Sequence, residues 1–354
     1  MLFCKRFLSV LTALAFVLSA TVCAYAVDPP ATGATSVCVM DADSGRVLYE
    51  KNAKEERCIA SITKIMTGIL AIENNKDLDQ TITVSATAEA EEGSSMYLLK
   101  GDKLSLRTAL YGTMLRSGND AAVAVAECTA GSVEKFVDMM NQKAKELGMT
   151  HTHYSWPNGL IDEDNYSCAR DMAVLSRYAM QNKTFAKIVS TWYIETDDGY
   201  QIENHNKMLS RDKRCIGIKT GFTNAAGRTL VTCFQDEDSD QRVIIVTLND
   251  YDHYNDHSNF CNWAFENYKQ KTLVKANTAV ATVENDGKKA TLAAKDALTW
   301  PVAKGENAKI TSRLRIQSNQ GVPMKEGTVG GRLIFYSDGK EIASTDLLYQ
   351  NAAS

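Results

Sequence analysis

The sequence has few of the residues that most catalytic sites use. It holds five histidines in 354 residues, no Cys-x-x-Cys pair and no Gly-x-Ser-x-Gly segment. An α/β-hydrolase is therefore disfavoured, and a zinc site is not expected. No glycine-rich phosphate loop follows a predicted strand. The net charge of −4 and the lack of a basic stripe argue against nucleic acid as a partner.

The five histidines are predicted to lie at solvated surface. Two alternate within a predicted loop, so they do not form a helical zinc pair, and two have i,i+4 spacing but stand among Asp, Asn and Tyr. We therefore expect no catalytic or metal-binding role for any of them: His151, His153, His205, His253 and His257.

Cysteines are scattered, and their number after residue 26 is odd. This distribution favours buried free thiols that pack as small hydrophobic groups, although one or two disulfides whose pairing the sequence does not specify remain open. The seven are Cys38, Cys58, Cys128, Cys168, Cys215, Cys233 and Cys261.

Long apolar runs are missing except at the N-terminus. A short basic stretch with Lys5 and Arg6 precedes an apolar run over 7–22, and Ala24-Tyr25-Ala26 has the small-x-small pattern of a cleavage site. We interpret residues 1–26 as a secretory signal peptide, with a retained membrane anchor as the alternative. The mature protein is then exported to the cell envelope or the extracellular space.

Hydrophobic periodicity predicts two regions of different character. A strand pair over 36–49 precedes helices, and apolar strands follow over 216–221, 229–234 and 242–248, which indicates an α+β domain with an antiparallel sheet. The predicted helices cover 59–73, 106–115, 120–127, 132–147, 169–181 and 260–269. Short alternating segments predict a small β-sandwich over 271–354, so the mature chain divides into 27–270 and 271–354.

One apolar stretch carries an unexpected charge. In Ala60-Ser61-Ile62-Thr63-Lys64 the serine and the lysine are three residues apart, and on a helix they share one face. Desolvation would lower the pKa of Lys64, and a neutral amine can then act as a general base for Ser61. Alone the pattern is weak, because most Ser-x-x-Lys segments are surface residues.

Two distant motifs strengthen this interpretation. Ser117-Gly118-Asn119 falls at a break between two predicted helices, where a hydroxyl and an amide can relay protons and hold a substrate amide. Lys219-Thr220-Gly221 falls on a predicted strand and offers a charge, a hydroxyl and room for a substrate backbone. Each has an ordinary alternative: Asn119 or Asp120 as a helix cap, and a plain strand end.

Together the three motifs resemble those of the penicillin-recognising serine enzymes. The surrounding residues are similar to the serine-type D-Ala-D-Ala carboxypeptidases, the low-molecular-mass penicillin-binding proteins, over about residues 35 to 268. They include Ala60-Ser61-Ile62-Thr63-Lys64, Gly93-Ser94-Ser95-Met96, Ser117-Gly118-Asn119-Asp120, Asn158-Gly159-Leu160 and Lys219-Thr220-Gly221-Phe222. The resemblance implies a β-lactamase/transpeptidase-like domain, an antiparallel sheet flanked by a helical cluster. The segment after about 272 is loosely similar to the β-rich C-terminal domain of many members.

The resemblance also implies roles for single residues. Ser61 is the nucleophile and Lys64 accepts its proton, while Ser117 relays a proton to the leaving D-alanine and Asn119 positions the substrate amide. Lys219 and Thr220 of the Lys219-Thr220-Gly221 strand hold the terminal carboxylate, and the N–H groups of Ser61 and Phe222 form the oxyanion hole. The substrates are peptidoglycan stem peptides ending in D-Ala-D-Ala, β-lactams are covalent inhibitors, and no metal or cofactor is required.

Three features depart from the family pattern. Ile59 stands where a proline is common, and Cys168 occupies a usual hydroxyl position in Ser167-Cys168-Ala169-Arg170-Asp171. The membrane-anchoring C-terminal helix of many relatives is missing, which leaves membrane-surface association open.

Two other functions use similar residues. A class A-like β-lactamase would need a glutamate that activates the deacylating water, and Glu163 lies in the right loop but in the wrong context, Asp162-Glu163-Asp164-Asn165. A non-catalytic β-lactam sensor or wall-binding protein is the other alternative. Endopeptidase action on cross-links would use the same chemistry as carboxypeptidase action.

Overall fold

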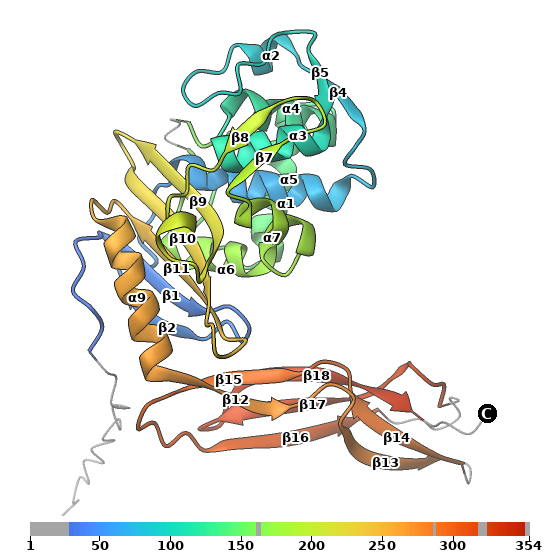
Figure 1. Cartoon of the computed structure of the whole chain (residues 1–354). Helices are drawn as coiled ribbons and strands as arrows, with labels where there is room; N and C mark the ends of the chain where they lie inside the picture. Colours follow the sequence, from blue (N-terminus) through green and yellow to red (C-terminus); the bar gives the residue numbers. More distant parts are fainter. Residues whose placement is uncertain (1–27, 161–163, 286–287, 318–323, 351–354) are drawn as a thin grey trace, which may run out of the picture.

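The computed structural model describes residues 28–160, 164–285, 288–317 and 324–350. The predicted signal peptide and Glu163 lie outside these residues. Figure 1 shows a larger body of helices and strands, with an elongated β body beneath it. None of the helices in the described ranges is long and apolar enough to span a bilayer.

An antiparallel sheet of five strands forms the centre of the larger body. Its order is β2-β1-β11-β10-β9, so the first strand pairs with one that follows about 200 residues later, as Val37 opposite Thr247. The strands are β1 (Ser36–Asp41), β2 (Val47–Lys51), β9 (Cys215–Thr223), β10 (Gly227–Gln235) and β11 (Arg242–Leu248). This confirms the predicted strand pair and the antiparallel sheet.

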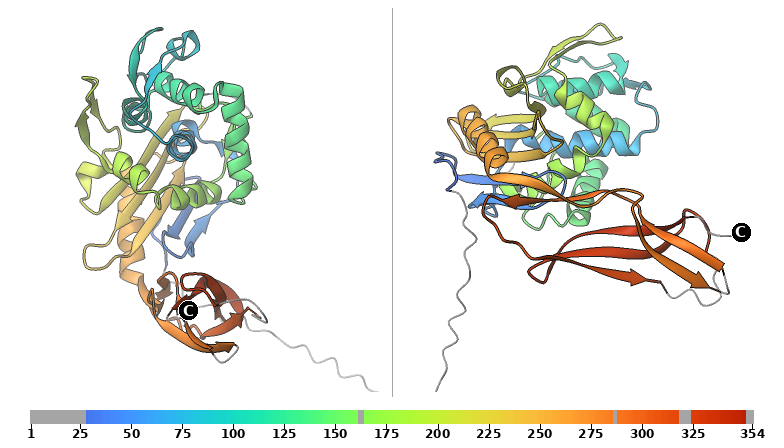
Figure 2. Two further views of the ribbon diagram at one scale, coloured as in Figure 1. Left: turned by 90° about the vertical axis from the view of Figure 1, so that its right-hand side faces the viewer. Right: turned by 60° about the horizontal axis from the view of Figure 1, so that its bottom comes forward.

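Both faces of this sheet are buried. On β1, Cys38 and Met40 pack into the helical cluster, whereas Val37 and Val39 pack against the last helix of the body, α9 (His253–Asn267). The alternation follows from the two-residue period of a strand. Figure 2 shows α9 on one side of the sheet and six longer helices of the cluster on the opposite side. They are α1 (Lys64–Asn74), α3 (Leu106–Tyr111), α4 (Asn119–Ala130), α5 (Val133–Glu146), α6 (Ala169–Ala179) and α7 (Lys183–Ser190).

Shorter elements complete the larger body. They are β3 (Arg57–Cys58), β4 (Thr81–Thr83), α2 (Ala86–Glu89), β5 (Lys103–Ser105), β6 (Tyr166–Ser167), β7 (Tyr193–Glu195), β8 (Gln201–Glu203) and α8 (Met208–Arg211). All seven cysteines in the described residues are free. Five are buried, which confirms those five as small core groups, whereas Cys58 and Cys128 are half-buried.

The predicted helix over 260–269 has the wrong bounds. The helix α9 begins at His253 and ends at Asn267, because Tyr268 already pairs with Ala303 in the next sheet. The polar residues from 253 to 259 concealed the start of the helix, since they break the apolar pattern that predicted it.

A second core lies in the C-terminal β body. A five-stranded sheet of order β13-β14-β18-β17-β16 packs with a two-stranded sheet, β12-β15, around Val274, Leu292, Leu333, Leu347 and Tyr349. The strands are β12 (Tyr268–Val274), β13 (Ala279–Asn285), β14 (Lys288–Ala294), β15 (Leu298–Ala303), β16 (Ile310–Ile316), β17 (Val329–Ser337) and β18 (Lys340–Gln350). The predicted β-sandwich is confirmed.

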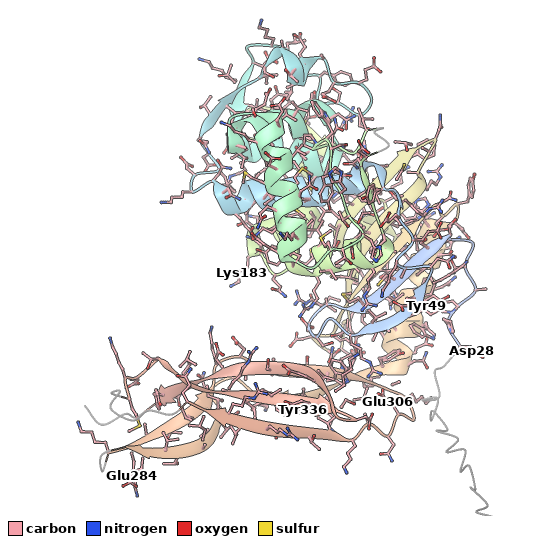
Figure 3. The ribbon with its side chains drawn as sticks, turned by 180° about the vertical axis from the view of Figure 1, so that it is seen from behind. Asp28, Tyr49, Lys183, Glu284, Glu306 and Tyr336 are labelled. Carbon is pink, nitrogen blue, oxygen red and sulfur yellow. The ribbon has the colours of Figure 1, made fainter. Side chains whose placement is uncertain are left out.

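Arg46, from the turn between β1 and β2, joins the two bodies. Its Nη1 and Nη2 each donate to the Glu306 carboxylate at 3.0 Å, and its guanidinium lies 5.3 Å from the Trp300 ring centre. Figure 3 shows Glu306 at the end of the β body that meets the larger body. A forked, partly buried pair of this kind fixes orientation better than an exposed ion pair does.

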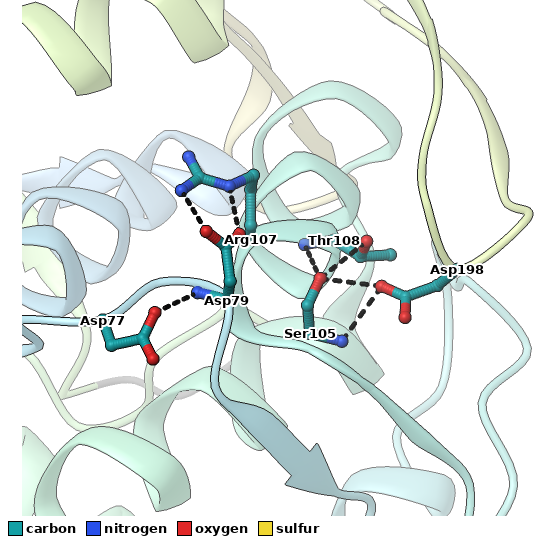
Figure 4. A network of polar contacts seen from close by, with 6 residues as sticks. All are labelled: Asp77, Asp79, Ser105, Arg107, Thr108 and Asp198. Carbon is teal, nitrogen blue, oxygen red and sulfur yellow. Dashed lines mark hydrogen bonds and ion pairs between the residues drawn. The ribbon is translucent and has the colours of Figure 1, made fainter.

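A hydrogen-bonded contact also connects the β7–β8 hairpin to the helical cluster. Asp198 in the hairpin loop accepts hydrogen bonds from the backbone N–H of Ser105 at 3.0 Å and from its hydroxyl at 2.7 Å (Figure 4). Ser105 is also the N-cap of α3 and accepts from Thr108 N–H. The chain continues from α3 into a π-helical turn, Gly112–Arg116, which ends at Ser117. The contact therefore fixes the start of α3, the helix that leads into this turn.

Candidate active site

Ser61 and Lys64 lie at the start of α1. The predicted regular helix from residue 59 is wrong at its first turn, because Ala60–Thr63 forms a 3-10 turn and the α-helix begins at Lys64. Residues three apart eclipse in a 3-10 turn, which brings Lys64 Nζ within 2.9 Å of Ser61 Oγ. Ser61 is half-buried, and Lys64 is fully buried.

The Lys64 amine has three oxygen neighbours. Besides Ser61 Oγ, they are Asn119 Oδ1 at 2.7 Å and the main-chain carbonyl of Asn158 at 2.8 Å. The last two are carbonyl oxygens that only accept, whereas a serine hydroxyl both donates and accepts. A neutral amine has two N–H groups and one lone pair, and therefore satisfies the two carbonyls while accepting the Ser61 proton.

Burial favours the neutral amine. Desolvation lowers the pKa of Lys64 well below its ordinary value, and the nearby charge of Lys219 lowers it further. Glu91 and Asp120 act in the opposite direction and raise it. Desolvation is the largest of these effects, so the site can supply a base without a histidine.

The second motif lies at the junction of two helices. Ser117 adopts a left-handed conformation with φ of 64°, and Asn119 is the first residue of α4. Neither Asn119 nor Asp120 caps this helix, whose N-cap is Gly118 without a side-chain bond. Asp120 accepts from the N–H groups of Met96 and Leu98, and also from that of Ala121 in the first turn of α4. Neither residue is therefore the N-cap that the alternative named, although Asp120 binds one N–H of the first turn.

The third motif lies on β9 beside the 3-10 turn. Lys219 is 1% exposed, its Nζ donates to the carbonyl of Thr220 at 3.1 Å, and burial lowers its pKa to about 7. Among the described residues no carboxylate lies within ion-pair distance of it. A buried ammonium without a counter-ion is costly, which makes this position ready to bind an anion.

Gly221 has a structural reason to be glycine. A Cβ there would lie 2.4 Å from Thr229 Oγ1 and 3.0 Å from the backbone nitrogen of Ser61. The missing side chain lets β9 approach the backbone of Ser61. Phe222 follows at the rim, 60% exposed, with the Arg228 guanidinium 5.7 Å from its ring centre.

A cavity of about 380 Å³ brings the motifs together. Of the predicted residues, Ser61, Ser117, Thr220, Gly221 and Phe222 line it. Lys64, Asn119 and Lys219 lie behind this lining, fully or almost fully buried. Within the described ranges, no group of three or more His, Cys, Asp or Glu side chains is arranged to hold a metal ion.

Seven residues that line the cavity were not predicted from the sequence. Ser94 belongs to the family-like stretch Gly93-Ser94-Ser95-Met96, but no role was predicted for it. The other six lie in regions where no motif was found. The seven are Ser94, His205, Lys207, Arg228, Thr229, His253 and Tyr254.

The prediction of solvated histidines is wrong for His253 and His257. Both are buried, and His257 is fully enclosed between the hydroxyls of Thr232 and Thr247 at 2.7 and 3.0 Å. Burial lowers the pKa of His257 well below its ordinary value. His257 is three and four residues before the buried Phe260 and Cys261. A predicted helix that began at residue 253 would therefore have placed His257 on the buried face of α9.

Cys168 takes over a hydrogen bond that a hydroxyl would usually make. It is the N-cap of α6, and its Sγ accepts from the N–H of Asp171 at 3.4 Å. The departure at this position therefore replaces a strong acceptor by a weak one, without removing the cap.

Family models match most of this chain. A family model described as D-alanyl-D-alanine carboxypeptidase matches residues 23–252, and one described as penicillin-binding protein 5, C-terminal domain, matches residues 268–353.

Several characterised proteins are similar over most of the chain. The D-alanyl-D-alanine carboxypeptidase DacF of Bacillus subtilis is 30% identical over 88% of this chain and 84% of its own length. The D-alanyl-D-alanine carboxypeptidase DacC of Escherichia coli is 32% identical over 91% of this chain and 84% of its own length. The crystal structure of penicillin-binding protein 5 from Haemophilus influenzae superposes with a TM-score of 0.75 at 27% identity, covering 92% of this chain and 99% of that one. This chain therefore belongs to the D-alanyl-D-alanine carboxypeptidase family of low-molecular-mass penicillin-binding proteins.

Proposed function

We propose that this protein is a serine D-alanyl-D-alanine carboxypeptidase that removes the terminal D-alanine from peptidoglycan stem peptides. The observation that carries the proposal is the Lys64 amine, which is buried, 2.9 Å from Ser61 Oγ, and held by two carbonyl oxygens. This arrangement activates a serine without histidine, and family membership supplies the substrate class.

In the proposed acylation, Ser61 Oγ attacks the carbonyl carbon between the two D-alanines, and its proton passes to Lys64 Nζ. The C–N bond then breaks, and Ser117, which lines the same cavity, relays the proton to the leaving nitrogen. The released D-alanine carries the new amine, and the shortened peptide remains as an ester on Ser61. Water then adds to the ester carbonyl, Ser61 Oγ regains a proton as the C–O bond breaks, and the trimmed peptide leaves.

The terminal carboxylate is proposed to bind Lys219 and Thr220. The buried ammonium of Lys219 has a pKa of about 7, and a carboxylate beside it would raise that pKa and keep the charge. The N–H groups of Ser61 and Phe222 are the proposed oxyanion donors, supported by the close approach of β9 at Gly221 to Ser61. Asn119 is proposed to position the substrate amide while it holds Lys64.

We further propose that β-lactams acylate Ser61, because the family shares this serine chemistry. We also propose that the protein acts outside the cytoplasmic membrane, which the N-terminal sequence pattern supports.

The mature chain is proposed to divide into 27–270 and 271–354. The separate hydrophobic core of the β body supports this division.

Release of free D-alanine from a synthetic acyl-D-Ala-D-Ala peptide tests the function. The wild type should release it, and Ser61→Ala should abolish both this release and labelling by penicillin. Labelling of Ser61 without any D-alanine release would instead indicate a sensor. Fast turnover of a chromogenic cephalosporin, without stable acylation, would indicate a β-lactamase.

A further inference from the structure

The two residues whose carbonyl oxygens hold the Lys64 amine are both hydrogen-bonded to one short segment. This segment, residues 91–94, follows α2, and no role was predicted for it from the sequence. One of the carbonyls belongs to the side chain of Asn119, and the other to the main chain of Asn158.

Glu91 holds the Asn158 side of the amine. Its Oε2 accepts from Asn158 Nδ2 at 2.6 Å, and its Oε1 accepts from the indole Nε1 of Trp156 at 2.9 Å. Asn158 is fully buried, and its Oδ1 accepts from the N–H of Leu160 at 2.8 Å. Both ends of the Asn158 side-chain amide are therefore bound, next to the main-chain carbonyl that accepts from Lys64.

The rest of the segment holds the Asn119 side. Asn119 Nδ2 donates to the carbonyl of Glu92 at 2.5 Å, and the Asn119 N–H donates to the carbonyl of Ser94 at 2.7 Å. Gly93 between them has φ of +85°, and a Cβ there would lie 3.0 Å from Asn119 Nδ2. The backbone can pass this close to Asn119 only because residue 93 is glycine.

We propose that Glu91 is a positioning residue for acylation, which orients the Asn158 carbonyl toward Lys64 and places a negative charge near the amine. This inference rests on the proposed function, since it assigns Lys64 the role of base for Ser61. Glu91 does not touch the reacting atoms and acts through Asn158.

Charges from three elements act on the Lys64 amine. Lys219 on β9 lowers the pKa of Lys64, whereas Glu91 and Asp120 raise it, Asp120 being on α4. Asp120 is also bound to the backbone of Met96 and Leu98, so replacing it would disturb that loop. Glu91 is the better residue for a test, because its charge and its hydrogen bonds can be removed separately.

The test measures the acylation rate constant with a β-lactam across pH for the wild type, Glu91→Gln and Trp156→Phe. Glu91→Gln removes the charge that favours the protonated amine. The acid limb of the profile, where the acylation rate constant falls as the pH drops, should therefore move to lower pH by roughly half a unit or more. The variant also places an amide N–H₂ group against either Trp156 Nε1–H or Asn158 Nδ2–H, and two donors cannot bond. The pH-independent acylation rate constant above the acid limb should therefore fall about tenfold. Trp156→Phe keeps the charge and removes one hydrogen bond, so it should lower this rate constant and leave the acid limb in place.

Glu89→Gln is the matched control, because Glu89 is an exposed side chain two residues earlier on α2. Glu89→Gln should match the wild type both in the position of the acid limb and in the acylation rate constant above it. An acid limb in Glu91→Gln that coincides with that of the wild type would overturn the proposal. So would an equal shift in Glu89→Gln, which would show a general effect of surface charge. If instead the wild type is neither acylated nor releases D-alanine, the proposed function fails, and the two failures are thereby distinguished.

Discussion

The start of α1 and the middle of β9 each bury a lysine beside the same cavity, but the two surroundings differ. Lys64 meets three oxygen atoms, whereas the one acceptor found for Lys219 among the described residues is the carbonyl of Thr220. Burial lowers the pKa of both. The full set of acceptors around Lys64 suits an amine that stays in place and exchanges a proton. The unfilled hydrogen-bonding capacity of buried Lys219 suits a cation that binds an anionic group.

The largest effect should come from Lys64→Ala. Removing a general base costs 10²- to 10⁴-fold in rate, and penicillin acylation should fall by about that factor. Lys76→Ala is the control, because Lys76 is exposed just beyond the end of α1. Acylation kinetics would show the loss, and a wild-type rate in a folded Lys64→Ala variant would contradict the role of base.

Lys219→Ala should lower kcat/KM for the peptide by roughly 10- to 150-fold, the range of one charge-assisted hydrogen bond. The loss should be specific to a free terminal carboxylate. We therefore compare acyl-D-Ala-D-Ala with its C-terminal amide in both proteins. Wild-type protein should prefer the free acid, and the variant should lose this preference. A preference that survives the substitution would place the carboxylate elsewhere.

Gly221→Ala should reduce acylation by roughly tenfold or more, because the added Cβ would push β9 away from Ser61 and misalign the site. Gly33→Ala is the matched control, since a Cβ there meets nothing within 4 Å and its φ is not in the left-handed range. Equal rates in the two variants would show that the close approach of β9 has no part in catalysis.

The smallest effect concerns stability. The pKa of Lys219 is about 7 in the folded protein and near 10.5 when unfolded, so between these values the unfolded chain binds more protons and stability rises with pH. Lys219→Met should therefore raise the thermal midpoint by several degrees below pH 7, at roughly 2–4 °C per kcal/mol of relieved burial cost, and the gain should shrink as the pH rises toward 10.5. Thermal unfolding across pH measures this, and a gain independent of pH would point to packing alone.

The reactive residues of the three motifs could be predicted from the sequence. Ser61, Lys64 and Lys219 belong to short motifs whose order and spacing are recognisable, and the strands of the central sheet have simple apolar patterns. The Asn158 carbonyl was not predictable as an acceptor for Lys64, because a main-chain oxygen leaves no trace in the sequence. The contacts of Glu91 with Trp156 and Asn158 span about 65 residues, and nothing local signals them. His257 was missed because its polar neighbours concealed the helix that buries it.

The pH dependence of β-lactam acylation in the wild type tests the central claim most directly, because only a neutral Lys64 can accept the proton of Ser61. The account predicts a single-proton acid limb, in which the acylation rate constant falls as the pH drops through the lowered pKa of Lys64. A rate constant that stays unchanged down to the lowest pH at which the protein remains folded would contradict it.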